Sequence, residues 1–172
     1  MRKRTVSLAL LLGLTVWAVV QQGLYWPHWP ERVATHFGPS GRADGWMNRG
    51  SAVLFQTVLQ TMFPWLLVAI GQWVGKLPNA VINMPHKEYW LAPERRVESL
   101  QWMAGMLSWV AVLMSVFLSC LGHLTYRANM TGENLALGPF LVVLGLFLAS
   151  VFALTGSSLW RFRRPPAERS TR

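Results

Sequence analysis

The chain has 172 residues, of which 52% are hydrophobic and only 13% are charged. Soluble domains carry about 25% charged residues, so this composition argues against an ordinary soluble protein and favours a lipid environment. The net charge of +9 could suit a nucleic-acid-binding protein. The basic residues instead flank apolar runs and build no basic stripe, which is typical of membrane-orienting charge and argues against a nucleic-acid partner.

Four apolar stretches are long enough to cross a bilayer, because a transmembrane helix needs about 20 predominantly apolar residues. None of them contains Asp, Glu, Lys or Arg. The pattern predicts an all-α integral membrane protein in which residues 1–160 form a single domain. Its four transmembrane helices are expected at about residues 5–25, 51–75, 100–124 and 135–160. Residues 161–172 are predicted to be a basic, disordered tail.

The first stretch also has features of a signal peptide, because Met1-Arg2-Lys3-Arg4 precedes a run rich in Leu and Val. The sequence Val16-Trp17-Ala18 is a poor cleavage site, since the bulky Trp17 would lie next to the scissile bond. The apolar run also continues to Trp26. We therefore favour a retained transmembrane helix.

The basic residues predict the direction of the spans. One side of the membrane would hold only Arg32, Arg42, Arg49 and Arg127. The other side would hold the remaining 12 of the 16 Lys and Arg residues: Arg2, Lys3, Arg4, Lys76, Lys87, Arg95, Arg96, Arg161, Arg163, Arg164, Arg169 and Arg172. By the positive-inside rule, both termini and the loop between the second and third spans are cytoplasmic. We expect a multi-pass protein of the bacterial cytoplasmic (inner) membrane, with the first loop outside.

The outer loop between the first two spans is long and polar for so small a membrane protein. In residues 33–37, Val, Thr and Phe alternate with Ala and His in a brief strand-like pattern. The sequence Gly38-Pro39-Ser40-Gly41 that follows is a strong turn signal. Residues 42–46 are then expected to return as a second short strand or an irregular arm. Ser51 is expected to cap the second helix. A structured loop of this length indicates a site more than a linker.

Several residues that could carry chemistry fall on this side of the membrane: His28, His36 and Asp44 in the loop, and His123 and Glu133 beyond the third span. Imidazoles and carboxylates bind metals and transfer protons. Their spacing matches no compact metal-binding motif, so loop-shaping hydrogen bonds are favoured and no metal, cofactor or catalytic residue is assigned. The alternative is a metal-dependent membrane enzyme that uses His36, Asp44 and His123.

The inner loop between the second and third spans contains three prolines, at positions 78, 85 and 93, which exclude one continuous helix. Aromatic and charged residues are concentrated near its end. They suit an interfacial anchor on anionic headgroups, and they equally suit a docking surface for a cytoplasmic partner. Both interpretations stay open for the candidate docking residues Tyr89, Trp90, Glu94, Arg95 and Arg96.

The outer loop resembles a known family. Residues 29–38 and 41–46 are similar to the bacterial membrane domain of unknown function found at the N-terminus of SdpI-type immunity and signalling proteins. That domain has a proline, a His-Phe pair, a glycine turn, an Asp-x-Trp motif and a basic residue. These are matched here by Pro30, His36, Phe37, Gly38, Gly41, Asp44, Trp46 and Arg49. Ala43 replaces the proline that usually precedes the Asp. Residues 83–96 of the inner loop resemble the sequence found in short stand-alone members of the group.

The resemblance implies a helical inner-membrane protein with this loop outside and a role in immunity or signalling. The chain ends after its fourth span without the SdpI-specific second half, which argues against toxin immunity itself. We expect a non-enzymatic protein with a ligand- or peptide-binding outer loop and an anchoring or signalling inner loop. The ligand-binding or loop-defining residues would be His36, Phe37, Gly38, Gly41, Asp44, Trp46 and Arg49.

A small oligomeric transporter is a further alternative, with a pore between copies of a homo-oligomer. It is disfavoured because ion pathways usually need buried charge, and the only ionisable residue near a span is His123. The expected partners are therefore the lipid bilayer and a peptide or protein, with homo-oligomerisation left open.

Overall fold

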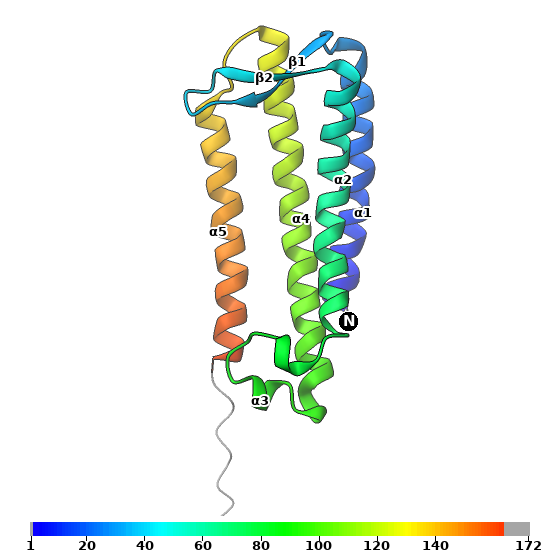
Figure 1. Ribbon diagram of the computed structural model, residues 1–172, viewed down its shortest axis with the longest axis vertical. Coiled ribbons are helices and arrows are strands. Elements are labelled where there is room, and N and C mark those ends of the chain that lie inside the picture. The colour runs from blue at the N-terminus through cyan, green and yellow to red at the C-terminus, as the bar shows by residue number, and fades with distance from the viewer. Residues whose placement is uncertain (1, 164–172) are drawn as a thin grey trace, which may run out of the picture.

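The computed structural model describes residues 2–163 of the chain. Its long helices α1 (Arg2–Tyr25), α2 (Arg49–Val74), α4 (Pro93–Thr131) and α5 (Leu137–Phe162) run along the same long axis (Figure 1). All four are long and apolar enough to cross a membrane. The protein is therefore mostly helical and multi-pass, and each span predicted from the sequence overlaps one of these helices.

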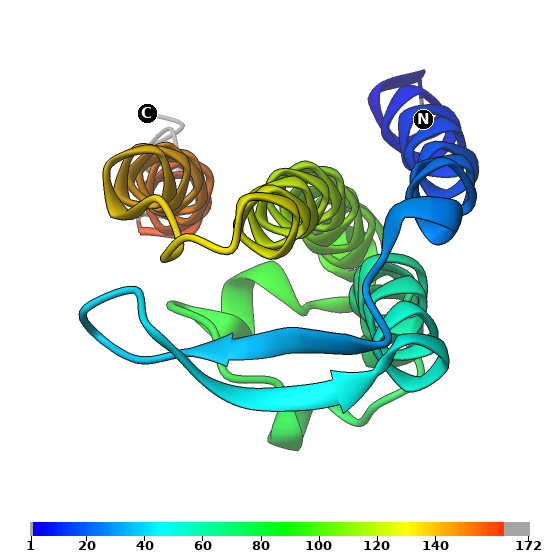
Figure 2. The ribbon, with the colours of Figure 1, turned by 90° about the horizontal axis from the view of Figure 1, so that it is seen from above.

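Helix α4 lies at the centre of the bundle and packs against the other three long helices (Figure 2). Helices α1 and α2 also contact each other, whereas α5 packs mainly on α4. With 39 residues, α4 is about 58 Å long, well beyond the roughly 30 Å of a hydrocarbon core. It therefore extends past the predicted span at both ends and supports the loops there.

The buried faces of the helices carry small or polar side chains, while large apolar side chains point outward. Lipid is as apolar as leucine, so helices in a membrane associate through close backbone approach, which small residues allow. Leu54 and Met62 of α2 are each 65% exposed. The buried residues of α2 recur at nearly every fourth position: Ala52, Gln56, Gln60, Pro64, Val68 and Gly71. The corresponding face of α4 includes Ala104, Ser108, Ala111, Ser115, Ser119 and Gly122.

One end of the bundle is covered by a β-hairpin. After the short 3-10 helix η1 (Trp26–His28), strand β1 (Arg32–Phe37) pairs antiparallel with β2 (Ala43–Asn48). The hairpin crosses the end of α4 and reaches from α2 towards α5 (Figures 1 and 2). Of the two possibilities for residues 42–46, a second strand or an irregular arm, the structure has the strand. The resulting two-stranded sheet is an exception to the predicted all-α fold.

The cap of α2 differs from the prediction. The side chain of Asn48 accepts a hydrogen bond from the backbone N–H of Ser51 at 2.8 Å. Asn48 is extended at the N-cap position, where its oxygen reaches a free N–H of the first turn. Ser51 already lies inside the helix and supplies that N–H, so the prediction that Ser51 is the cap was wrong.

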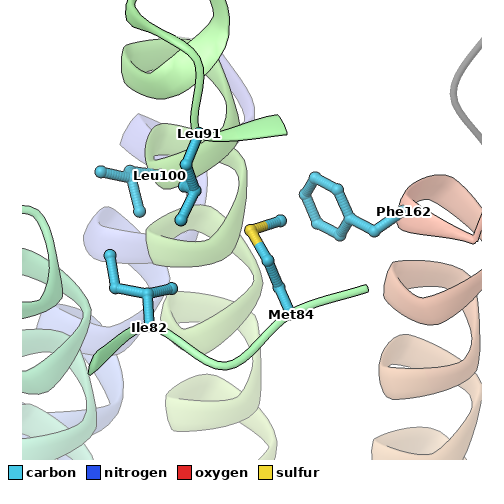
Figure 3. Packing of buried hydrophobic residues seen from close by; sticks show 5 residues of the cluster. All are labelled: Ile82, Met84, Leu91, Leu100 and Phe162. Carbon is cyan, nitrogen blue, oxygen red and sulfur yellow. The ribbon is translucent and has the colours of Figure 1, made fainter. Parts of the chain in front are cut away.

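The opposite end of the bundle holds the inner loop, with η2 (Asn79–Val81) and α3 (Lys87–Trp90), beside the start of α1 and the end of α5 (Figure 1). An apolar cluster joins this loop to α4 and α5: Ile82, Met84, Leu91, Leu100 and Phe162 (Figure 3). Helix α5 thus continues through the first two residues of the predicted tail. Arg163 follows the helix, and residues 164–172 of that tail lie outside the described residues.

Candidate functional site

Strand β1 is tied to helix α4 by one side chain. The amide oxygen of Asn129 accepts from the backbone N–H of Ala34 at 2.7 Å, and its nitrogen donates to the carbonyl of Ala34 at 3.0 Å. The same nitrogen donates to the carbonyl of Thr125 at 2.9 Å. Both backbone groups of Ala34 are therefore satisfied by an amide that takes the place of a neighbouring strand.

Two backbone hydrogen bonds hold the ends of the hairpin. The N–H of Arg49 donates to the carbonyl of Glu31 at 3.0 Å, and the N–H of Leu135 donates to the carbonyl of Gly41 at 2.8 Å. Gly41 has a φ of +78°, and a Cβ there would lie 2.7 Å from the carbonyl oxygen of Leu135. The turn therefore needs glycine for its conformation and for its close contact with the α4–α5 connection.

An aromatic cluster supports the base of the hairpin. The rings of Tyr25 and Tyr126 stack with centroids 3.8 Å apart, and Trp29, only 1% exposed, meets both rings edge-on. The hydroxyl of Tyr25 lies 2.7 Å from Nδ1 of His123. His123 is therefore engaged with the end of α1.

The exposed side of the hairpin carries a histidine–aspartate pair. Nδ1 of His36 lies 2.5 Å from Oδ1 of Asp44, and the two side chains are 74% and 53% exposed. Glycines leave room for this pair. A Cβ at Gly45 would lie 2.9 Å from Cβ of His36, and one at Gly38 would lie 3.1 Å from Oδ2 of Asp44. The structure therefore brings together His36, Gly38 and Asp44 of the predicted motif.

Beside this pair, arginines lie over tryptophan rings. The guanidinium of Arg32 is 4.8 Å from the ring centroid of Trp46, and that of Arg49 is 6.0 Å from the ring of Trp26. Trp46 is 46% exposed. A shallow depression of about 390 Å³ is lined by Glu31, Arg32, Asp44, Gly45, Trp46, Met47 and Asn48. Its hydrogen-bonding groups and its exposed ring could contact a polar ligand or an extended peptide.

The remaining motif residues have structural contacts. Phe37 is half-buried and faces Ala43 across the hairpin, and Gly41 forms the turn. Among residues 2–163, no three His, Cys, Asp or Glu side chains lie together in a group that could hold a metal ion. The structure thus joins His36 to Asp44 but does not bring His123 into a metal-binding group with them.

In the inner loop, Arg96 binds the backbone of its own chain. Its guanidinium donates to the carbonyl of Leu77 at 2.8 Å, to the carbonyl of Gly75 at 3.2 Å and to Oδ1 of Asn79 at 2.9 Å. Arg95 donates to the carbonyl of Tyr89 at 2.8 Å and lies 4.0 Å from the centre of its ring. These arginines shape the loop, and their role in docking a partner stays a prediction.

The other two candidates in this loop differ in their contacts. Nε1 of Trp90 donates to the carbonyl of Phe162 at 3.1 Å, and the two rings pack edge to face. Glu94 is exposed in the first turn of α4, directly after Pro93. Trp90 therefore fastens the loop to α5, whereas the carboxylate of Glu94 faces solvent.

Two features at the hairpin end of the bundle were missed by the sequence analysis. One is Asn129, whose amide holds β1. The other is a set of buried polar side chains between α1, α2 and α4, which includes Gln21, Gln22, Gln56 and Gln60. The spacing of Gln56 and Gln60, one helical turn apart in an apolar span, was a signal for a polar inner face. Nothing local pointed from Asn129 to Ala34.

Comparison with known proteins adds a family match to this geometry. The chain is similar to a domain of unknown function (DUF1648) over residues 8–61, which reach from α1 through the hairpin into α2. The match supports the resemblance as far as a domain of unknown function, and the association with SdpI-type proteins goes beyond it. No curated protein and no solved structure matches the chain.

Proposed function

We propose that this protein is a non-catalytic membrane protein of the bacterial inner membrane whose hairpin binds a peptide or protein outside the cytoplasm. The direction is supported by charge. Arg32, Arg42, Arg49 and Arg127 lie at the hairpin end, and the positive-inside rule assigns the more basic end to the cytoplasm. The resemblance to SdpI-type proteins adds immunity or sensing as the biological setting.

The observation that carries this proposal is the division of the hairpin into a fastened side and a free side. Val33 and Ala34 are buried against the bundle, and Gly41 is held by Leu135. The side chains of His36, Asp44 and Trp46 are exposed. A rigid support with free polar and aromatic side chains is the usual composition of a recognition surface.

The free edge of β2 suggests how a peptide would bind. Strand β2 lies on the side of β1 that faces away from α4 (Figure 2). In the described part of the chain, residues 43–47 receive no backbone hydrogen bond from outside the hairpin. An extended peptide would add to β2 as a third strand. Trp46 and the His36–Asp44 pair would then contact its side chains.

The proposal is tested by site-specific photocrosslinking in cells. A photoreactive residue in place of Met47, which is 37% exposed in the depression, should capture an extracytoplasmic peptide or protein. The captured band should fall at least tenfold in the double variant His36→Ala/Asp44→Ala. It should persist in the control Arg42→Ala, because Arg42 is exposed but does not line the depression. Equal capture by both variants would contradict the role of the pair, and capture of lipid alone would contradict peptide binding.

The inner loop would act as the anchoring or signalling element. Its apolar cluster joins the loop to α4 and α5, so a change at the hairpin that moves either helix would reach it. The candidate surface comprises Tyr89, Trp90, Glu94, Arg95 and Arg96, of which Glu94 has the most accessible side chain. Loss of signalling in Glu94→Lys, with ligand capture at Met47 unchanged, is the expected result.

A further inference from the structure

A cluster of polar side chains lies inside the bundle below the hairpin. Nε2 of Gln22 donates to Oε1 of Gln56 at 3.1 Å, which joins α1 to α2. Nε2 of Gln21 donates to the carbonyl of Ser119 at 3.4 Å, which joins α1 to α4. Gln60 is one turn further along α2 and only 2% exposed. These bonds account for part of the hydrogen-bonding capacity of the cluster.

The groups left over are all oxygens. Among the described residues, no hydrogen-bond partner is present for Oε1 of Gln21, Gln22 and Gln60 or for Oγ of Ser115 and Ser119. A buried polar group without a partner costs about 1–3 kcal/mol in proteins, and the hydrocarbon chains of lipids offer no donors. Helix association alone does not explain such a set, because apolar side chains of similar size would pack without this cost. The cluster therefore calls for a hydrogen-bond donor.

A cavity gives such a donor access to Gln60. It has a volume of about 70 Å³, lies between α2 and α4, and has Thr35 of β1 among its lining residues. Its polar lining consists of Thr35, Gln56, Gln60 and Thr125. A water molecule needs only about 10–15 Å³ of such space, so a hydroxyl group fits in the cavity.

The rim of this cavity is apolar. Phe55, Leu59 and Leu121 line it, and Phe55 is 46% exposed on the outer surface of α2. No Asp, Glu, Lys, Arg or His lines the cavity. The site therefore combines neutral acceptors inside with an apolar exit towards the surrounding lipid.

Gly122 keeps the amide of Gln60 in place. A Cβ at position 122 would collide with Nε2 of Gln60, and Oε1 of Gln56 would lie 3.5 Å from it. Gly122 is buried on the face of α4 that meets α2. Any side chain at this position would push the amide of Gln60 out of its present position.

From these observations we propose that the cavity between α2 and α4 binds a neutral lipid alcohol, such as a diacylglycerol or a long-chain alcohol. The hydroxyl donates to Oε1 of Gln60, and the hydrocarbon chain leaves past Phe55. The site is separate from the depression on the hairpin and does not depend on peptide binding there.

The test uses the full chain in phospholipid nanodiscs and a photoreactive, long-chain alcohol as the probe. The methyl ether of the same probe is the matched control, because it keeps the chain and the oxygen but cannot donate. We expect saturable labelling by the alcohol in the peptides that contain residues 55–60 and 118–125. The ether should label them at least tenfold less, and unlabelled diacylglycerol should compete.

Three variants decide the role of the cluster. Gln60→Leu removes the acceptor and should reduce labelling at least tenfold, while Gln72→Leu, an exposed glutamine on the same helix, should not. Gly122→Ala keeps every glutamine but displaces the amide of Gln60, so it should also reduce labelling. Circular dichroism establishes that each variant is folded. Equal labelling by alcohol and ether, or unchanged labelling in both Gln60→Leu and Gly122→Ala, would overturn the proposal.

Discussion

The two ends of the bundle are fastened in opposite ways. At the hairpin end, the bonds that hold the loop involve its backbone: Asn129 binds the N–H and carbonyl of Ala34, and Leu135 binds the carbonyl of Gly41. At the other end, the candidate docking side chains make the bonds themselves: Arg96 donates to two loop carbonyls and to Asn79, and Trp90 donates to a carbonyl of α5.

This difference determines which side chains are free. Backbone fastening leaves the side chains of His36, Asp44 and Trp46 on the surface, where they can meet a partner. Side-chain fastening uses Arg96 and Trp90 for the structure of the loop itself. Aromatic and arginine residues are thus prominent in both loop sequences. The hairpin nevertheless exposes three of its motif side chains, whereas Glu94 is the one exposed residue among the five candidates of the inner loop.

The largest effect is expected for Phe162→Ala. Phe162 is 3% exposed and meets Trp90 and Trp102 edge-on, as part of the cluster in Figure 3. Removing a buried aromatic ring costs about 3–5 kcal/mol, which detergent-titrated unfolding would measure. Phe152→Ala on the same helix, where the ring is 72% exposed, is the control and should cost less than about 1 kcal/mol. Similar losses in the two variants would show that the inner cluster is not a core.

The next largest effect is expected for Arg96→Met, at about 3 kcal/mol, because the carbonyls of Gly75 and Leu77 lose charged donors. Proteolysis within residues 75–92 should accelerate, while the hairpin stays protected. Arg96→Lys keeps the charge but cannot reach several acceptors at once, so it should restore less than half of the stability. Full restoration by lysine would mean that charge alone holds the loop.

At the hairpin end, Asn129→Ala should cost about 2 kcal/mol, since the N–H and carbonyl of Ala34 lose their partner. Hydrogen exchange of β1 should speed up selectively, with the inner loop unchanged. Asn134→Ala, at an exposed position in the α4–α5 connection, should change neither quantity. If β1 stays protected in Asn129→Ala, the aromatic cluster below it must be the main attachment.

Two glycine substitutions distinguish the cost of backbone strain from the cost of a steric contact. Gly41→Ala should cost about 2 kcal/mol, because Gly41 has a φ of +78° and its Cβ would meet the carbonyl of Leu135. Gly132→Ala should cost about 1 kcal/mol, since Gly132 has a φ of +68° and open space around its Cβ. Thermal unfolding of both variants measures the difference, and equal losses would show that the contact with Leu135 is unimportant.

The smallest effect on stability is expected for His36→Ala/Asp44→Ala. The two side chains are 74% and 53% exposed, and exposed ion pairs contribute about 0–1 kcal/mol. Unfolding should therefore change by less than about 0.5 kcal/mol, even though partner capture falls. A large loss of stability would mean that the pair holds the hairpin together and would weaken the comparison between the two ends.

Features that depend on neighbouring residues could be predicted from the sequence. Uncharged apolar runs predicted the four spans, because a helix in lipid satisfies its own backbone groups. Alternation in residues 33–37 and the turn at Gly38–Gly41 predicted a structured loop, because strand periodicity and glycine turns are local. The short turn also brings His36, which lies opposite Gly45, within hydrogen-bond distance of Asp44, eight residues away in the sequence.

The contacts between side chains of different helices, in contrast, could be found only in the folded structure. Asn129 binds Ala34 across 95 positions, and Tyr25 binds His123 across 98. These pairs depend on the rotation and depth of each helix relative to its neighbours, which no local pattern in the sequence specifies. The same packing gathered the glutamines of α1 and α2 into one polar cluster, although each lay in a span that looked uniformly apolar.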